Sequence, residues 1–196
     1  FNLNSELLGR GDIHKTVSHY KIKKEQIKEV YEGHEVAVHT LTHPDLTKLD
    51  ADTVTNELTV DKTNLEAFFG TKVTGMAYPF GTYNDMVVDC IDKCGICYSR
   101  TTASTGKFDF PQNWLTLHPT CHHNNPRLME LARSFVEDKP YKSYRSRPPK
   151  LFYLWGHSYE FDRKDNWEHI EEICKKLSKL SQKVLTLDLK SVIIFI

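Results

Sequence analysis

The stretch Val36-Ala37-Val38-His39-Thr40-Leu41-Thr42-His43-Pro44 decides how the fold of this chain is interpreted. Its first three residues form a short apolar run, which predicts a buried strand. His39 and His43 follow four residues apart, so two imidazoles can bind one metal ion if the backbone turns between them. In α/β proteins the active site is built just past the carboxyl ends of parallel strands. The stretch therefore predicts a metal site at the end of such a strand.

Strand and helix patterns alternate on both sides of this stretch. We expect strands within 1–4, 35–39, 73–77, 96–99, 151–155 and 184–189, and helices within 23–31, 53–69, 84–94, 126–135 and 166–180. Residues 108–119 are expected to be irregular, 139–150 to form a surface loop, and the apolar tail 190–196 to dock as a strand or stay exposed. The alternation predicts an α/β fold with a parallel sheet and outer helices, either doubly wound or closed as a barrel.

Composition excludes several classes of protein. The chain has 196 residues, which suits a single domain, and its 26 basic residues balance 26 acidic ones, so we expect no nucleic-acid partner. Its longest apolar run, Val192 to Ile196, is too short for a membrane span. An odd count of 5 cysteines predicts free thiols and a cytoplasmic location. Because the first residue is Phe1, we expect a fragment or a processed product.

Three expected strand ends carry unusual side chains. The first carries His39 and His43, the second the turn Tyr78-Pro79-Phe80-Gly81, and the third Trp155-Gly156-His157-Ser158. In a barrel, the carboxyl ends of all strands meet at one rim. The order of these segments therefore predicts one active site built from all three.

These segments resemble known motifs. His39-Thr-Leu-Thr-His43-Pro44, Ala77-Tyr-Pro-Phe-Gly81-Thr-Tyr-Asn84-Asp85 and Leu154-Trp-Gly-His157-Ser-Tyr-Glu160 are similar to the second, third and fifth motifs of the polysaccharide deacetylase family. The resemblance runs from Phe1 to about Leu180. It implies a distorted (β/α) barrel of about seven strands, an N-acetylated carbohydrate as substrate, and a divalent metal, usually zinc, bound by one aspartate and two histidines.

The resemblance also implies residue roles. His39 and His43 match the metal-binding histidines, and His157 matches the general acid that protonates the leaving amine. The backbone N–H of Phe80 would contact the oxyanion, and Trp114 would line the site. Substrate contacts are expected from the aromatic and turn residues Tyr78, Pro79, Tyr83, Trp114 and Trp155. Such chemistry suits an acetamide, whose poor electrophilicity calls for a Lewis acid and a proton donor.

One family motif is missing from the chain. The first motif, an Asp-Asp pair that supplies the base and a metal ligand, has no match, so the domain over 1–196 is expected to lack its first strand. Asp12 or His14 could replace the lost ligand, although a polar loop is the simpler interpretation. The absence leaves two alternatives open: a catalytically silent carbohydrate-binding remnant, with Tyr159 among its stacking rings, or a variant acting on a non-sugar amide. Ala77 also departs from the arginine that many members have there.

Other motifs have simpler interpretations. Cys90-Ile-Asp-Lys-Cys94-Gly-Ile-Cys97 has the spacing of a cluster-binding motif, but one helix turn separates its first two thiols, which favours core packing. Adjacent His122 and His123 on an extended segment should point in opposite directions, so at most one is expected to face the rim. The basic run Tyr141 to Arg147 is interpreted as a solvated loop rather than a contact for an anionic glycan.

Overall fold

The computed structural model describes residues 1–8, 24–137, 150–184 and 190–194. The chain divides into two compact units, the first comprising Phe1–Ala103 with Asn113–His118 and the second Ser104–Gln112 with Pro119–Ile196. Asp12, His14 and the basic run 141–147 lie outside the described residues. The expectation of a single catalytic domain over 1–196 stays a prediction.

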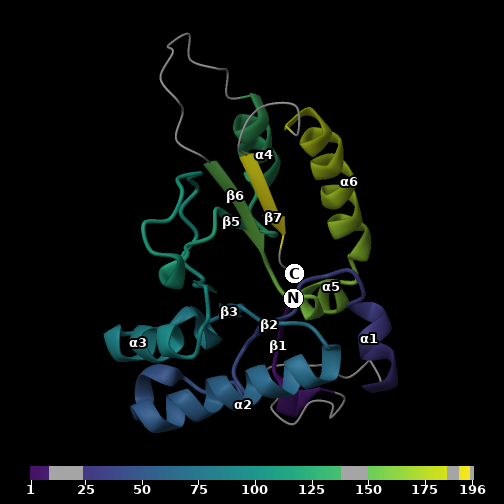
Figure 1. The fold of residues 1–196 in the computed structure, drawn as a ribbon. Helices are drawn as coiled ribbons and strands as arrows, with labels where there is room; N and C mark the ends of the chain where they lie inside the picture. The colour runs from purple at the N-terminus through teal and green to yellow at the C-terminus, as the bar shows by residue number, and fades with distance from the viewer. Residues whose placement is uncertain (9–23, 138–149, 185–189, 195–196) are drawn as a thin grey trace. The chain divides into compact units, whose positions relative to one another are not determined.

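The first unit contains a four-stranded parallel sheet in the order β1-β2-β3-β4. Its strands are β1 (Asn2–Leu3), β2 (Ala37–Val38), β3 (Gly75–Ala77) and β4 (Tyr98–Arg100). Figure 1 labels β1, β2 and β3 of this sheet. Val38 pairs with both Leu3 and Met76, so the ends of β1, β2 and β3 are in register. The residues that follow these three strands therefore leave the sheet at the same edge.

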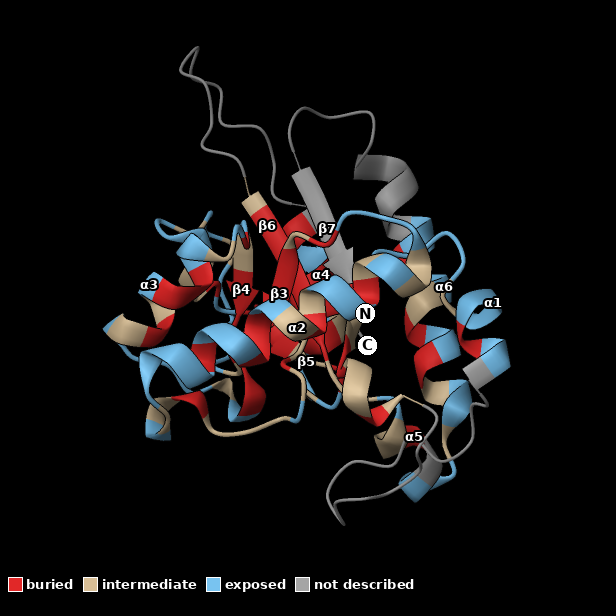
Figure 2. Cartoon of the chain, turned by 60° about the horizontal axis from the view of Figure 1, so that its bottom comes forward, coloured by how far each residue is buried: buried red, intermediate tan, exposed pale blue. Residues whose placement is uncertain are grey.

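Three helices accompany this sheet: α1 (Ile27–Val30), α2 (Ala51–Phe69) and α3 (Asp85–Lys93). The α2 helix begins where Asp50 accepts the Thr53 N–H at 2.8 Å, and it ends at Gly70 in the left-handed conformation, φ 73°. The Asn84 side chain caps α3 by accepting the Val87 N–H at 3.0 Å. The core lies between helices and strands, where Figure 2 shows buried segments, and includes Val38, Val54, Leu58, Leu65, Met76, Val87 and Ile91.

The second unit is built on a three-stranded parallel sheet in the order β5-β6-β7. Its elements are β5 (Cys121–His122), α4 (Leu128–Glu137), β6 (Lys150–Trp155), α5 (Tyr159–Lys164), α6 (Trp167–Val184) and β7 (Lys190–Ile194). Its apolar core joins α4, β6, α5 and α6 through buried residues that include Leu131, Phe135, Phe152, Phe161, Ile170 and Ile173.

Short 3₁₀ turns complete the described elements. They cover Ser5–Leu7, Lys24–Gln26, Leu46–Lys48, Pro79–Gly81 and Trp114–Thr116. The described helices include none with the length and apolar character needed to span a bilayer. The cysteines are free thiols, and Cys90 is buried in the core of the first unit, as expected.

The α/β class with parallel strands is confirmed by both sheets. At the C-terminal side, the expected strand over 184–189 is wrong at its first residue, because α6 continues through Val184, and the rest of that range lies outside the described residues. The tail docks as β7, one of the two expected outcomes. Helix α4 begins at Leu128 rather than Pro126, and α5 was not anticipated.

Candidate active site

The two expected metal ligands, His39 and His43, lie in a tight loop that directly follows β2. Thr40 and His43 adopt the left-handed backbone conformation, with φ of 67° and 63°. The Thr40 hydroxyl accepts the His43 N–H at 3.0 Å and stabilises this turn. The two imidazole rings consequently approach to 4.7 Å between centroids, at an interplanar angle of 70°. The loop thus provides the turn that the four-residue spacing requires.

His39 has the protonation pattern of a metal ligand. Its Nδ1 lies 2.8 Å from the carbonyl oxygen of Ala77, at the end of the neighbouring strand β3. A carbonyl can only accept, so we assign the ring proton to Nδ1, which leaves the lone pair of the neutral ring on Nε2. Metal-binding histidines typically donate their second ring N–H to a carbonyl or carboxylate in this way. The imidazole pair therefore fits a divalent metal, with His39 Nε2 and the His43 ring as donors.

Two acidic residues of α2 hold this loop in place. Asp61 accepts the His39 N–H at 3.2 Å and the Ser5 N–H at 2.6 Å, and thus ties the ends of β2 and β1 together. Glu57, one helix turn earlier, accepts the Thr42 N–H at 2.9 Å and the Thr42 hydroxyl at 2.8 Å. Burial raises the pKa of Asp61 to about 7, with a smaller contribution from Glu57, against hydrogen bonds from Ser5 and His39 that lower it.

This support was not predicted, although the sequence carries a signal for it. Asp61 is 0% exposed and Glu57 8%, and both lie among the apolar positions Leu58 and Leu65 that α2 turns toward the core. Acidic side chains are rarely buried unless they bind partners. Their place on an otherwise apolar helix face therefore indicates that both carboxylates form specific hydrogen bonds.

The turn after β3 lies beside the histidine pair. Phe80 adopts φ 58°, is 60% exposed, and places its ring centroid 4.9 Å from that of His43. Tyr78 and Pro79 are buried; the Tyr78 hydroxyl donates to the Leu115 carbonyl at 2.6 Å. Tyr83 stacks on Tyr78 with centroids 5.2 Å apart. The structure thus brings His39, His43 and Phe80 together, while the oxyanion and substrate contacts of this turn stay predictions.

The two expected tryptophan contacts differ in exposure. Trp114 begins a short 3₁₀ turn of the first unit and is 37% exposed. Trp155 ends β6 in the second unit, is 8% exposed, and donates its indole N–H to the Ser104 hydroxyl at 3.3 Å. Their contacts with a sugar stay predictions, as does the convergence of the three strand ends on one rim.

In the second unit, the expected general acid His157 is paired with a carboxylate. His157 follows β6 by two residues, and Glu160 lies in the first turn of α5. The His157 Nδ1 and the Glu160 Oε1 are 2.8 Å apart, and the His157 side chain is 40% exposed. Glu160 belongs to the motif that contains His157, but no role was predicted for it. The spacing of three residues across the start of a helix was the available signal.

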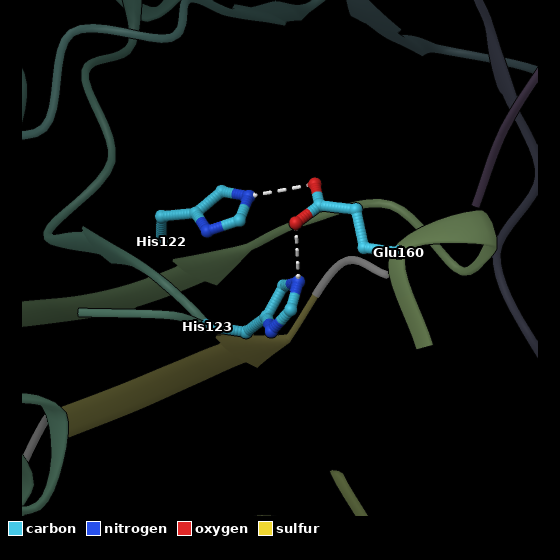
Figure 3. A group of neighbouring side chains, drawn as sticks. All are labelled: His122, His123 and Glu160. Atoms are coloured by element: carbon cyan, nitrogen blue, oxygen red, sulfur yellow. Dashed lines mark hydrogen bonds and ion pairs between the residues drawn. The ribbon is translucent and has the colours of Figure 1, made fainter. Parts of the chain in front are cut away.

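His122 and His123 both contact the same carboxylate, as Figure 3 shows. The His122 Nε2 lies 3.1 Å from Oε1 of Glu160, and the His123 Nε2 lies 3.2 Å from Oε2. The expectation that these neighbouring histidines point in opposite directions is therefore wrong. Strand β5 ends at His122 and the chain turns at His123, so strand alternation does not apply. The possible ligand atoms of His122, His123 and Glu160 lie within 4.8 Å of one another, which is close enough for all three to contact one metal ion.

Burial favours the neutral form of both His122 and His123. Burial lowers the pKa of His123 to about 4, with the charge of His122 adding to the effect and Glu160 opposing it. Burial also lowers the pKa of His122, again against the influence of Glu160. For Glu160, burial alone raises the pKa, but the hydrogen bond from His157 and the surrounding imidazoles outweigh it and lower the net value. The lowered pKa favours the ionised form of Glu160, which accepts hydrogen bonds from its neighbours.

A histidine pair and a buried carboxylate network at the carboxyl ends of parallel strands define an α/β protein with a candidate metal-hydrolase site. Residues 11–99 match the family model described as polysaccharide deacetylase. This segment, which contains His39, His43 and the turn at Phe80, is thus polysaccharide deacetylase sequence, a family of hydrolases, and the resemblance noted from the motifs is confirmed. His157 and Glu160 lie outside the matched range. No curated protein matches the chain significantly.

Several solved structures are similar to parts of the chain. A Streptococcus pyogenes deacetylase, PplD, in complex with acetate is 24% identical, with a TM-score of 0.49 over 60% of this chain and 49% of its own. BC0361, a polysaccharide deacetylase from Bacillus cereus, is 27% identical, with a TM-score of 0.45 over 57% of this chain and 34% of its own. A mutant of BA3943, described as a CE4 family pseudoenzyme with restored enzymatic activity, is 18% identical, with a TM-score of 0.48 over 88% of this chain and 52% of its own. The chain thus spans about half or less of each of these structures.

Proposed function

We propose that this chain is a metal-dependent hydrolase that removes N-acetyl groups from an amino-sugar polymer or oligomer. Two observations support the proposal: the family match over residues 11–99, and the His39 ring, whose Nδ1 bond to Ala77 leaves Nε2 as a metal donor. The proposal includes the distorted barrel of about seven strands. In each described sheet the strand order follows the chain order without reversal, as in a barrel and unlike a doubly wound sheet.

Each site residue has a separate task in this proposal. His39 and His43 hold the divalent cation, proposed to be zinc, which supplies Lewis acidity to the amide carbonyl and to water when bound. The backbone N–H of Phe80 donates to the carbonyl oxygen as charge develops on it. When its ring carries protons on both nitrogens, His157 delivers the Nε2 proton to the departing amine nitrogen as the C–N bond breaks and keeps the proton on Nδ1. A positioned general acid typically accelerates such a step by about 10²–10⁴-fold.

Metal content tests the assignment of the histidine pair. The wild-type chain should retain about one equivalent of metal by plasma emission after dialysis, whereas the double variant His39→Ala/His43→Ala should retain none. His34→Ala is a matched control, because His34 is an exposed histidine near the same strand. Unchanged metal content in the double variant would show that the pair is not the metal site.

Acetate release tests the reaction itself. Incubation with N-acetylglucosamine oligomers should release acetate, and His157→Gln should slow the release by about 10²–10⁴-fold without loss of metal. Binding of the oligomers without acetate release would instead favour a carbohydrate-binding protein of the same fold. If the oligomers are neither bound nor hydrolysed, but simple acetamides release acetate, a non-sugar amide is favoured as the substrate.

A further inference from the structure

The carboxylate of Glu160 is surrounded by donors on both oxygens. Oε1 lies 2.8 Å from His157 Nδ1 and 3.1 Å from His122 Nε2. Oε2 lies 2.7 Å from the Asn124 side-chain nitrogen and 3.2 Å from His123 Nε2. A carboxylate has about four lone-pair positions, so these four nitrogens can use its full accepting capacity. Such saturation fixes both the position and the ionisation of Glu160.

The proton positions on His122 follow from its second nitrogen. The backbone N–H of Asn124 points at His122 Nδ1, at 3.2 Å, so Nδ1 must carry the lone pair. The neutral His122 ring therefore has its proton on Nε2 and donates it to Glu160. A metal bound at the same Nε2 would need that lone pair on Nε2 instead.

His123 is a poor metal ligand for a related reason. Its ring packs against Phe161, and among the described residues its Nδ1 has no hydrogen-bond partner. A metal-binding ring normally donates its second N–H to an acceptor, which His123 lacks in this part of the chain. His122 and His123 are thus arranged as donors around the carboxylate of Glu160.

This arrangement determines which nitrogen of His157 carries the ring proton. Because the Glu160 carboxylate can only accept, the His157 proton on that side is held on Nδ1, and Nε2 becomes the atom that exchanges protons. We propose that Glu160 is the positioning residue of the general acid His157, and that His122 and Asn124 lock Glu160 in place from the end of β5. This inference rests on the proposed function for the role of His157, but the hydrogen-bond arrangement it describes can be measured without activity.

Nitrogen NMR tests the arrangement directly. With ¹⁵N-labelled protein at a pH where the ring is neutral, His157 should give the signature of a protonated Nδ1 and an unprotonated Nε2. In Glu160→Ala this signature should be replaced by a mixture of both tautomers. Glu168→Ala, which removes an exposed glutamate of α6, should leave His157 unchanged. A His157 proton on Nε2 in the wild type, or an unchanged spectrum in Glu160→Ala, overturns the proposal.

Kinetics and metal titration complete the test. Glu160→Gln should lower kcat for acetate release about 10–100-fold with KM within about twofold, because supporting partners of reactive histidines have effects of this size. A rise in KM with unchanged kcat would overturn the positioning role. If the wild type releases no acetate, the proposed function fails, whereas the NMR result still decides the arrangement. Zinc that shifts the His122 and His123 signals in the wild type, but not in Glu160→Ala, would show a metal site there and overturn the proposal.

Discussion

The side-chain amide of Asn4 donates a hydrogen bond of 2.7 Å to the backbone carbonyl of Thr40. The same nitrogen donates to the carbonyl of His39, and Asn4 is only 1% exposed. Both amide hydrogens thus bind the loop that carries the expected metal ligands. The end of β1 therefore fixes the geometry of residues that follow β2, through a side chain that is itself no ligand.

Asn4→Asp should strongly destabilise the first unit. The substitution keeps the size of the side chain but turns a buried double donor into a carboxylate facing two carbonyl oxygens. We expect the free energy of unfolding to fall by about 3 kcal/mol or more, as measured by urea denaturation. Asn56→Asp, on the exposed side of α2, is the matched control and should change stability by about 0.5 kcal/mol at most. Equal effects of the two variants would show that the Asn4 contacts contribute nothing specific.

Asp61 should make stability depend on pH in an unusual direction. Its pKa rises from 3.8 to about 7 in the folded chain, chiefly because of burial. Between these values the folded state binds more protons than the unfolded state, so the free energy of unfolding falls as pH rises. The contribution is fully present below about pH 4 and lost above about pH 7, and a shift of this size corresponds to at most about 4 kcal/mol.

The variant Asp61→Asn isolates this contribution. The other titrating groups are common to both proteins, so the difference in unfolding free energy between wild type and Asp61→Asn should shrink from pH 4 to pH 7. Urea denaturation at several pH values measures it, with Asp89→Asn on the exposed part of α3 as the control. A constant difference across this range would mean that Asp61 titrates normally in the folded chain.

The sequence was most informative where local rules apply. The expected helix over 53–69 is confirmed as α2. Asn84 and Gly70, which lie at helix ends, are residue types suited to the backbone conformation of a cap. The pairing of His39 with His43 followed from their spacing and the apolar run before them. Such features depend on neighbours a few residues away.

The supporting contacts were not predictable in the same way. Asn4 and Asp61 act on residues 35 and 22 positions away, so no local pattern identifies their partners. The rule of strand alternation failed at His123, because it assumes an extended chain where the structure has a turn. Glu160 was visible three residues from His157, but its role depends on β5, a distant segment.

Gly81→Ala should show how tightly the turn beside His43 is packed. Gly81 has φ 75°, and a Cβ there would lie 2.2 Å from the Thr102 hydroxyl and 2.8 Å from the Thr102 backbone nitrogen. Gly70 has nearly the same φ, 73°, but a Cβ there meets no described atom within 4 Å. Gly70→Ala should therefore cost about 1–2 kcal/mol for the backbone conformation alone. Gly81→Ala should cost about 1–3 kcal/mol more, by urea denaturation, because of the added clash; equal costs would contradict the close approach.

Gly156→Ala should disturb the histidine cluster through a direct clash. Gly156 lies between Trp155 and His157, and a Cβ there would lie 2.0 Å from the ring carbon Cδ2 of His123. The His123 ring is buried and has little room to move, so we expect a loss of about 2–3 kcal/mol in unfolding free energy. The His157 environment, followed by ¹⁵N NMR, should change as well, because the displaced ring contacts Glu160.

A double-mutant cycle shows whether the clash is the cause. His123→Ala removes the ring that the new Cβ would meet, at its own cost in packing and hydrogen bonding. If the clash is responsible, Gly156→Ala should cost less than about 1 kcal/mol when introduced into His123→Ala, which gives a coupling energy of about 1–2 kcal/mol. Additive effects would instead assign the loss to the backbone between β6 and α5, and His123 would not be the residue that requires glycine at position 156.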